Sequence, residues 1–316
     1  MNRILMSMVM LVVSFNGFAA EKVDKTLEVS KNSYVRIEHV NGAAKISGWD
    51  KAEVKVSGTL GDKTDKFIFE RDGNDVVIKV KTKKHSGWGN WGSDDGDDLT
   101  IFVPINSKIN YSSVNAEVEV SGVRGGADVE TVNGGIEVKN LAGRIRLEAV
   151  NGEINASELE GDVKIETVNG DIRSRSSQGR DDRYSSVNGD INVQSQSEQL
   201  QVETVNGDVE LSLGSVRQLN LETVNGSLEA KMNLQKNGEV TASSVGGSVE
   251  LYFQDDVSAR FDIQAHAGGS ITNKLSEHKV QKDKYGPSRW LEFSINGGSA
   301  KVSVSTVSGK VTLASN

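Results

Sequence analysis

Two tryptophans and four aspartates lie within one glycine-rich stretch, "KKHSGWGNWGSDDGDDL", which begins at Lys83. Tryptophan rings can stack on sugars, and aspartate carboxylates are oxygen ligands of the kind that Ca²⁺ prefers. The aspartate spacing differs from the D-x-[DN]-x-[DN]-G pattern of an EF-hand loop. The stretch therefore predicts either a sugar or calcium site or an acidic loop without a ligand. Its candidate ligand-binding residues are Trp88, Trp91, Asp94, Asp95, Asp97 and Asp98.

Arginine and aspartate also gather in "RSRSSQGRDDRYSS", which begins at Arg173. Glycosidases use paired carboxylates about 5–10 Å apart. Polysaccharide lyases on parallel β-helices combine calcium-bound carboxylates with a basic residue. A solvated charge cluster on a bulged coil is the non-catalytic alternative. The candidate residues in this stretch are Arg180, Asp181, Asp182 and Arg183.

A third set of carboxylates follows glycine in a repeated phrase, at Asp162, Asp171, Asp190 and Asp208. Calcium-binding β-rolls share the nine-residue unit, but their pattern is G-G-x-G-x-D. No copy here has that glycine pair with aspartate at the sixth place. Aspartate after glycine more often bonds to nearby backbone N–H groups and completes a turn. We predict the turn role and keep the calcium-binding β-roll as an alternative.

Motifs for nucleophilic or metal-dependent catalysis are missing from the sequence. It has no cysteine, no G-x-S-x-G, no H-E-x-x-H and no Walker loop. The four histidines lack the spacing of metal ligands. We therefore predict a protein that is not an enzyme and that has no cofactor and no bound metal. A polysaccharide lyase or hydrolase remains the alternative.

A repeat that dominates the chain must position all of these residues. The phrase "ETVNGDIRS" begins at Glu166, and near copies begin at Glu130, Glu148, Glu203 and Glu222. A weaker phrase lies between the copies, as in "LAGRIRLEA" from Leu141, so each period contains two nine-residue halves. The asparagines of the main phrase are 18 or 19 residues apart, at Asn115, Asn133, Asn151, Asn169, Asn188, Asn206 and Asn225.

Apolar and polar residues alternate inside each half, as at Ile136 and Val138, which is typical of strands with one buried face. Antiparallel hairpins would place Asn-Gly in type I′ turns. A solenoid would instead stack equivalent strands in parallel, about 4.8 Å apart. Only the solenoid needs a constant period, because every coil must match the circumference of the last. We predict an all-β fold, a parallel β-solenoid of 18–19-residue coils, with the hairpin meander as the alternative.

Stacked coils would align identical side chains in columns. The asparagines should form a structural ladder that satisfies buried amides, which cost about 1–3 kcal/mol each when unpaired. The glycine that follows should supply a positive φ or room for a close backbone. An asparagine row that binds a ligand or ice is the alternative. The valines that precede the asparagines should form one apolar column: Val132, Val150, Val168, Val187, Val205 and Val224.

The flanks of the chain differ from this regular middle. Residues 1–20 are typical of a signal peptide, with Arg3 before an apolar run and small residues before the cleavage point. Residues 21–110 are predicted to form a β-rich N-terminal cap, because an open solenoid end exposes an unpaired strand edge. Residues 111–250 should be the regular coils, and residues 251–316 the C-terminal coils and cap.

Charge and hydropathy restrict the location and the partners. The chain has 36 lysines and arginines against 44 aspartates and glutamates, which disfavours nucleic acid. No segment after the predicted signal peptide is apolar for eighteen residues, so no transmembrane segment is expected. We expect an exported protein, either periplasmic or at the cell surface or secreted. A solenoid that is capped at both ends is expected to be a monomer.

Four features carry a family resemblance: "ISGWDKAEVKVSGTL" from Ile46, "DLTIFVPINSKINYSSVNAEVEVSG" from Asp98, the serial VNG units, and "STVSGKVTL" from Ser305. In these the chain resembles a family of bacterial extracytoplasmic proteins with the DUF4097 domain, labelled as candidate adhesins. The resemblance implies a β-solenoid-like domain in the cell envelope and brings no catalytic residues. We expect a structural or adhesive role toward an envelope polymer, a glycan or a protein.

Overall fold

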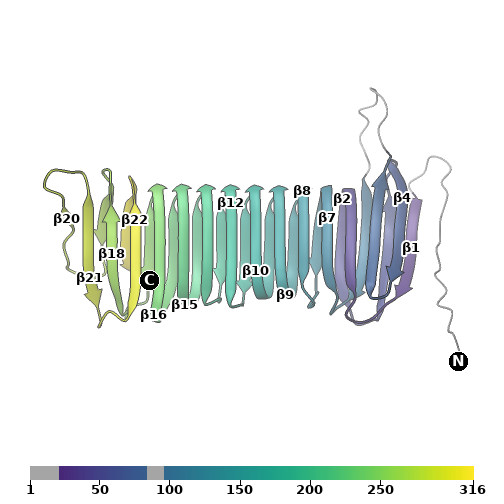
Figure 1. Ribbon diagram of the computed structural model, residues 1–316, viewed down its shortest axis with the longest axis horizontal. Coiled ribbons are helices and arrows are strands. Elements are labelled where there is room, and N and C mark those ends of the chain that lie inside the picture. The colour runs from purple at the N-terminus through teal and green to yellow at the C-terminus, as the bar shows by residue number, and fades with distance from the viewer. Residues whose placement is uncertain (1–20, 84–95) are drawn as a thin grey trace, which may run out of the picture.

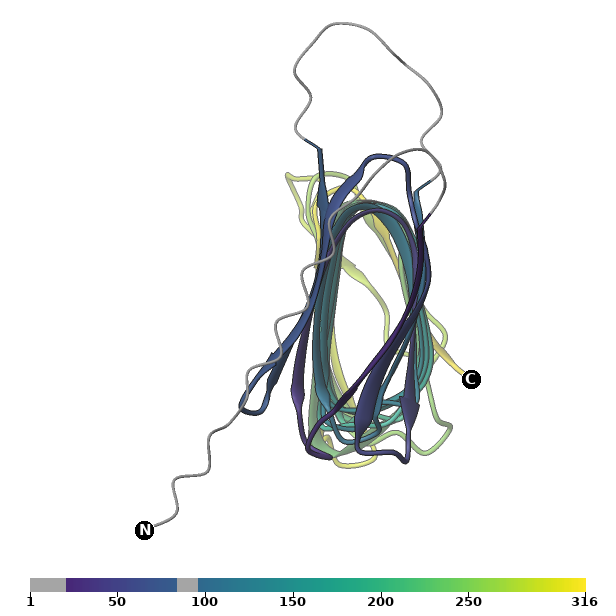
Figure 2. The same ribbon diagram turned by 90° about the vertical axis from the view of Figure 1, so that its right-hand side faces the viewer.

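The computed structural model describes residues 21–83 and 96–316, so the predicted signal peptide lies outside the described residues. The strands run across the long axis of an elongated rod (Figure 1). Seen from its end, the rod is flattened, with two walls of strands that face each other (Figure 2). Within these two ranges, no helix is long and apolar enough to cross a membrane.

The strands follow one another with short connections. The N-terminal part contains β1 (Glu21–Glu28), β2 (Tyr34–Trp49), β3 (Glu53–Leu60), β4 (Thr64–Asp72), β5 (Asp75–Thr82) and β6 (Asp97–Pro104). The middle contains β7 (Lys108–Ser121), β8 (Ala127–Asn133), β9 (Ile136–Asn151), β10 (Ile154–Asn169), β11 (Ile172–Ser177), β12 (Asp181–Asn188), β13 (Ile191–Ser195), β14 (Gln199–Asn206), β15 (Val209–Asn225) and β16 (Leu228–Gly246). The C-terminal part contains β17 (Val249–Phe253), β18 (Ala259–Ala265), β19 (Ser270–Asn273), β20 (Gln281–Lys282), β21 (Arg289–Ile295), β22 (Ala300–Thr306) and β23 (Lys310–Ser315).

Equivalent strands of successive coils pair in parallel and in register. Asn133 of β8 lies opposite Asn151 of β9, which lies opposite Asn169 of β10. The same register continues through β12, β14 and β15 as far as Asn225. The Asn-Gly turn therefore joins the two walls of one coil, not two paired strands. The predicted parallel β-solenoid is confirmed, and the hairpin alternative is wrong.

Aliphatic side chains from both walls fill the space between them. In β9, Ile136 and Val138 on one wall and Ile145 and Leu147 on the other are all buried. They belong to one continuous core that extends along the whole rod. Burying each such side chain contributes roughly 1.5–3 kcal/mol, so the repeated aliphatic positions are the main source of stability.

The valine of each repeat lies outside this core, so the predicted apolar column is on the surface of the solenoid. Val150 is 41% exposed, whereas Ala149 before it is buried. The reason is the alternation of the strand: Leu147 and Ala149 point inward, so Val150 must point outward. The alternation of the strand, not the residue type, decides which side chain is buried at the turn.

The N-terminal end is closed by antiparallel strands. β3 pairs antiparallel with β1 and with β6, and β4 pairs antiparallel with β5. β2 lies further inside, because it pairs in parallel with β5, β6 and β7. Charged residues are frequent on the outer strands β1 and β4. Such charges disfavour pairing with the edge of another sheet.

The last coil in sequence is not the last coil in space. β22 pairs with β16 on one side and β18 on the other, and β23 lies between β17 and β19. In this coil a Cβ on Gly309 would lie 1.8 Å from the carbonyl oxygen of Gly247, so the two turns approach each other closely. β21 then pairs antiparallel on the outer side of β18. Phe261 stacks on Phe293 with 4.6 Å between the ring centroids and closes this end of the core.

Candidate functional site

Asparagine side chains run in a row along the turn edge of the solenoid. The Nδ2 of each donates to the Oδ1 of the asparagine one coil earlier, at 2.8–3.1 Å. The row begins at Asn41, which adds one member to the predicted series, and ends at Asn225. From Asn115 onward the side chains are exposed, which corrects the expectation of buried amides. The amides therefore satisfy one another at the surface.

Asn169→Ala should lower the melting temperature and leave binding of a partner intact. The substitution removes the hydrogen bond to Asn151 at 2.8 Å and the one from Asn188 at 2.9 Å. Two exposed bonds are worth roughly 1–2 kcal/mol together, or about 2–6 °C in a chain of this size. Thermal unfolding checks this, with Asn155→Ala, an exposed asparagine outside the ladder, as control. Lost binding at an unchanged melting temperature would make the row a ligand contact instead.

Exposed valines form a second row beside the asparagines. Their exposed fractions are 39–48%, far above those of core valines. Contiguous exposed apolar rows of this kind mark interaction surfaces more often than scattered single residues do. We call the two rows together the Val–Asn edge. Its valines are Val114, Val132, Val150, Val168, Val187, Val205, Val224, Val245 and Val307.

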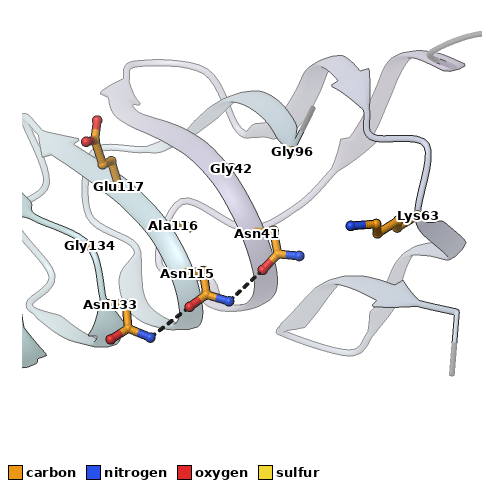
Figure 3. Close-up of a pocket in the computed structure, with 9 residues that line it drawn as sticks. All are labelled: Asn41, Gly42, Lys63, Gly96, Asn115, Ala116, Glu117, Asn133 and Gly134. Atoms are coloured by element: carbon orange, nitrogen blue, oxygen red, sulfur yellow. Dashed lines mark hydrogen bonds between the residues drawn. The ribbon is translucent and has the colours of Figure 1, made fainter. Parts of the chain in front are cut away.

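A groove of about 630 Å³ opens at the N-terminal end of the Val–Asn edge (Figure 3). Three asparagines of the ladder line one part of it, and Lys63 extends its amine toward the Asn41 end of the row. Amides, a lysine and a carboxylate are groups that bind hydroxyl-rich or charged ligands. The lining residues are Asn41, Gly42, Lys63, Gly96, Asn115, Ala116, Glu117, Asn133 and Gly134.

A buried polar network lies behind this groove. His39 places Nε2 3.2 Å from Oδ2 of Asp97 and Nδ1 3.1 Å from the hydroxyl of Tyr111. The N–H of Gly61 and the hydroxyl of Thr64 both donate to Oδ1 of Asp97 at 2.8 Å. Burial alone would raise the pKa of Asp97, but these hydrogen bonds outweigh it and hold the pKa below its usual value. The ring of His39 is buried, its Nδ1 is hydrogen-bonded to Tyr111, and its Nε2 lies at ion-pair distance from Asp97 without a hydrogen bond of good geometry, so the network is structural.

The candidate residues of the tryptophan-rich stretch are only partly placed. Trp88, Trp91, Asp94 and Asp95 lie outside the described residues. Asp97 points into the core and Asp98 is exposed, because consecutive residues of β6 face opposite sides of the wall. Asp97 and Asp98 therefore do not converge on one point.

The arginine and aspartate cluster is also divided by strand alternation. Arg180, Asp181 and Arg183 are exposed, but Asp182 is fully buried. Burial raises the pKa of Asp182 by more than the surrounding hydroxyl groups lower it. Asp181 and Asp182 thus face opposite sides of one wall and do not form the paired carboxylates that a glycosidase needs.

The turn aspartates connect neighbouring coils. The Oδ1 atoms of Asp171 and Asp190 accept the backbone N–H of the equivalent residue one coil later, at 3.0 and 2.8 Å. Asp208 accepts the N–H of Ser227 at 2.7 Å in the same way. The bond that sequence reasoning placed within one turn therefore crosses to the next. In the described part of the chain, no three histidines or carboxylates come together as metal ligands.

Sequence reasoning missed the burial of His39 and Asp97 and the exposure of the valines. A signal for His39 was present, because "EHVNG" places it where "ETVNG" has Thr131, which is buried. The alternation from Leu147 to Val150 also indicated an exposed valine. No local signal pointed to Asp97, whose contact with His39 crosses to another coil.

Comparison with known proteins gives a match over most of the chain. Residues 25–314 match the sequence model of the family described as Toastrack DUF4097. No curated protein matches the sequence.

Solved structures that match the chain have low identities and low TM-scores. A candidate adhesin from Bacteroides fragilis is 11% identical, with 93% of this chain and 98% of that chain covered and a TM-score of 0.37. A candidate adhesin from Parabacteroides distasonis is also 11% identical, with 94% and 98% covered and a TM-score of 0.37. A candidate lipid binding protein from the same organism is 11% identical, with 92% and 96% covered and a TM-score of 0.30. Likenesses at this level carry no information about ligands.

Proposed function

Because this chain belongs to the Toastrack DUF4097 family, we propose that it is a non-enzymatic, exported protein of the cell envelope or cell surface. Its role is structural or adhesive. It presents a stiff solenoid surface to an envelope polymer, a glycan or another protein.

The Val–Asn edge is the observation that supports this proposal. Nine valines keep about two-fifths of their surface exposed, although the core is complete without them. Covering the exposed part of one such valine would contribute about 0.6–1 kcal/mol. The same contact recurs in each coil that carries one of these valines, so an extended partner gains affinity with each such coil that it touches.

The polysaccharide-enzyme alternative receives less support from the placement of its candidate residues. A glycosidase needs two carboxylates on the same surface, with about 5–10 Å between them. Asp181 is exposed and Asp182 is buried in the core. Asp97 is likewise engaged by His39, Gly61 and Thr64.

The double variant Val187→Ser and Val205→Ser should bind isolated cell envelopes about tenfold more weakly than the wild type. Two valine contacts at the values above amount to roughly 1.4 kcal/mol, which is a factor of ten in affinity. Sedimentation of the labelled protein with envelope fragments measures the change. The melting temperature should remain close to that of the wild type, because both side chains are at the surface.

Gln178→Ser with Gln196→Ser is the matched control, because these exposed residues occupy neighbouring coils on the opposite edge. The control should bind like the wild type. Equal binding by all three proteins, or equal loss in both double variants, would contradict a binding role of the Val–Asn edge.

A further inference from the structure

One group of polar side chains interrupts the aliphatic core in the middle of the solenoid. Asp182 stands in register between Val163 and Leu200 of the adjacent coils, and Ser174 stands between Ala156 and Val193. We call this group the serine–aspartate node. It comprises Ser174, Ser177, Asp182, Tyr184, Ser195 and Ser197, all of which are buried.

Hydroxyl groups in the node crowd around one carboxylate oxygen. The hydroxyls of Ser177, Ser195 and Ser197 each lie 2.8 Å from Oδ2 of Asp182, and the hydroxyl of Tyr184 lies at 3.3 Å. A carboxylate oxygen has about two lone-pair sites, so four donors exceed what Oδ2 accepts. Oδ1 of the same group is buried and has no hydrogen-bond partner. The hydroxyls therefore bring more oxygen atoms to Oδ2 than it can accept hydrogen bonds from at one time, and Tyr184 has a second partner in Ser174, 3.3 Å away.

The carboxylate also lacks a counter-charge. Within residues 21–83 and 96–316, no basic side chain forms an ion pair or a hydrogen bond with Asp182. Arg180 and Arg183, its neighbours in sequence, are exposed on the outer side of the wall. A buried carboxylate without a cationic partner is strongly unfavourable.

We propose that the serine–aspartate node binds a monovalent metal cation of the Na⁺ class through the carboxylate of Asp182 and the hydroxyl oxygens of Ser177, Ser195 and Ser197. Hard cations prefer oxygen ligands. A serine hydroxyl that turns its proton away from the ion offers a lone pair, so the crowded oxygens become ligands. One carboxylate balances one positive charge, whereas Ca²⁺ sites draw on several carboxylates.

Thermal unfolding in different chloride salts tests the site. The protein is unfolded and refolded in NaCl, KCl or choline chloride at the same ionic strength, so that the buried site equilibrates with each cation. The melting temperature should be higher in NaCl or KCl than in choline chloride, because choline is too large for the core. The melting temperature should rise by about 2–4 °C for each tenfold increase in the concentration of Na⁺ or K⁺.

Asp182→Asn should abolish the difference between the salts, and Asp181→Asn, its exposed neighbour, should retain it. Equal melting temperatures of the wild type in all three salts would overturn the proposal. A melting temperature that depends on pH but not on the cation would also overturn the proposal, because it would show that Asp182 binds a proton instead of a metal ion.

A second measurement covers the case in which Asp182→Asn fails to fold. Wild-type protein refolded in NaCl is transferred into choline chloride by gel filtration, and the sodium that it retains is measured by atomic emission. A stoichiometric amount of Na⁺ should remain bound, and refolding in excess KCl should replace it with K⁺. Ser195→Ala, treated in the same way, should retain at least several-fold less. Sodium at the background level in the wild type would refute the site, and either result leaves the proposed role of the Val–Asn edge untouched.

Discussion

Gly134→Ala should destabilise the solenoid by at least about 3 kcal/mol, near the upper end of single-residue effects. A Cβ on Gly134 would lie 2.2 Å from the carbonyl oxygen of Ala116 in the preceding coil. The residue also has a φ of +148°, which side chains rarely adopt. The clash and the unfavourable φ both involve backbone atoms, so a change of side-chain rotamer relieves neither. The shift of the urea midpoint, followed by far-UV circular dichroism, measures the loss.

Gly135→Ala provides a control one residue away. Its Cβ would meet only the carbonyl oxygen of Glu153, at 3.5 Å, which is an ordinary contact. The equivalent positions of later coils hold Glu153 and Asp171, so a side chain fits there. Gly135→Ala should therefore unfold like the wild type. If both variants had the same midpoint, close approach between coils would not be the reason for the glycine.

The same contact recurs along the edge, which explains why the glycine of the phrase is constant. At each of the following positions, a Cβ would lie 2.0–2.2 Å from the carbonyl oxygen of the equivalent glycine one coil earlier. The positions are Gly152, Gly170, Gly189, Gly207, Gly226 and Gly247.

Asp97→Ala should cost roughly 3–5 kcal/mol of stability at neutral pH, because it removes one partner of a buried polar pair. His39 would lose the carboxylate 3.2 Å from its Nε2. The N–H of Gly61 and the hydroxyl of Thr64 would lose their acceptor. Asp98→Ala, at the exposed neighbouring position, should change the unfolding midpoint little. Equal midpoints for the two variants would show that the network adds nothing to stability.

The contribution of Asp97 should depend on pH in a defined direction. Its pKa in the folded protein is lowered, whereas in the unfolded chain it is near 3.9. The stabilisation is therefore fully present above about pH 4 and is lost as the pH falls toward the folded-state pKa. Urea midpoints between pH 2.5 and 7 should converge for the wild type and Asp97→Ala at the acid end. A difference that stays constant over this range would contradict the assignment.

The repeat was sufficient to predict the architecture. Asparagines at a spacing of 18 or 19 residues required coils of constant circumference, and the parallel register from Asn133 to Asn225 follows from that constraint. The asparagine row could be foreseen for the same reason, because identical residues at one phase must stack. Alternation inside each half also identified core residues such as Ile145 and Leu147.

Which residues are exposed at the candidate site depends on whether each side chain points inward or outward, and the residue type alone does not specify this. An apolar side chain such as that of Val150 usually faces the core, yet the strand that ends at the turn points it outward. Asp182 was expected at the surface because it is charged, yet β12 places it in the core. In both places the alternation of the backbone overrode the preference of the side chain.

The sequence by itself determined the period, the parallel stacking and the need for glycine at each turn, because these follow from residues repeated at short range. The tertiary structure alone decided the contact of Asp97 with His39, the crowding of hydroxyls around Asp182 and the insertion of the last coil beside β16. These features join residues from different coils, and a local pattern carries no information about which coils become neighbours when the chain departs from its repeat.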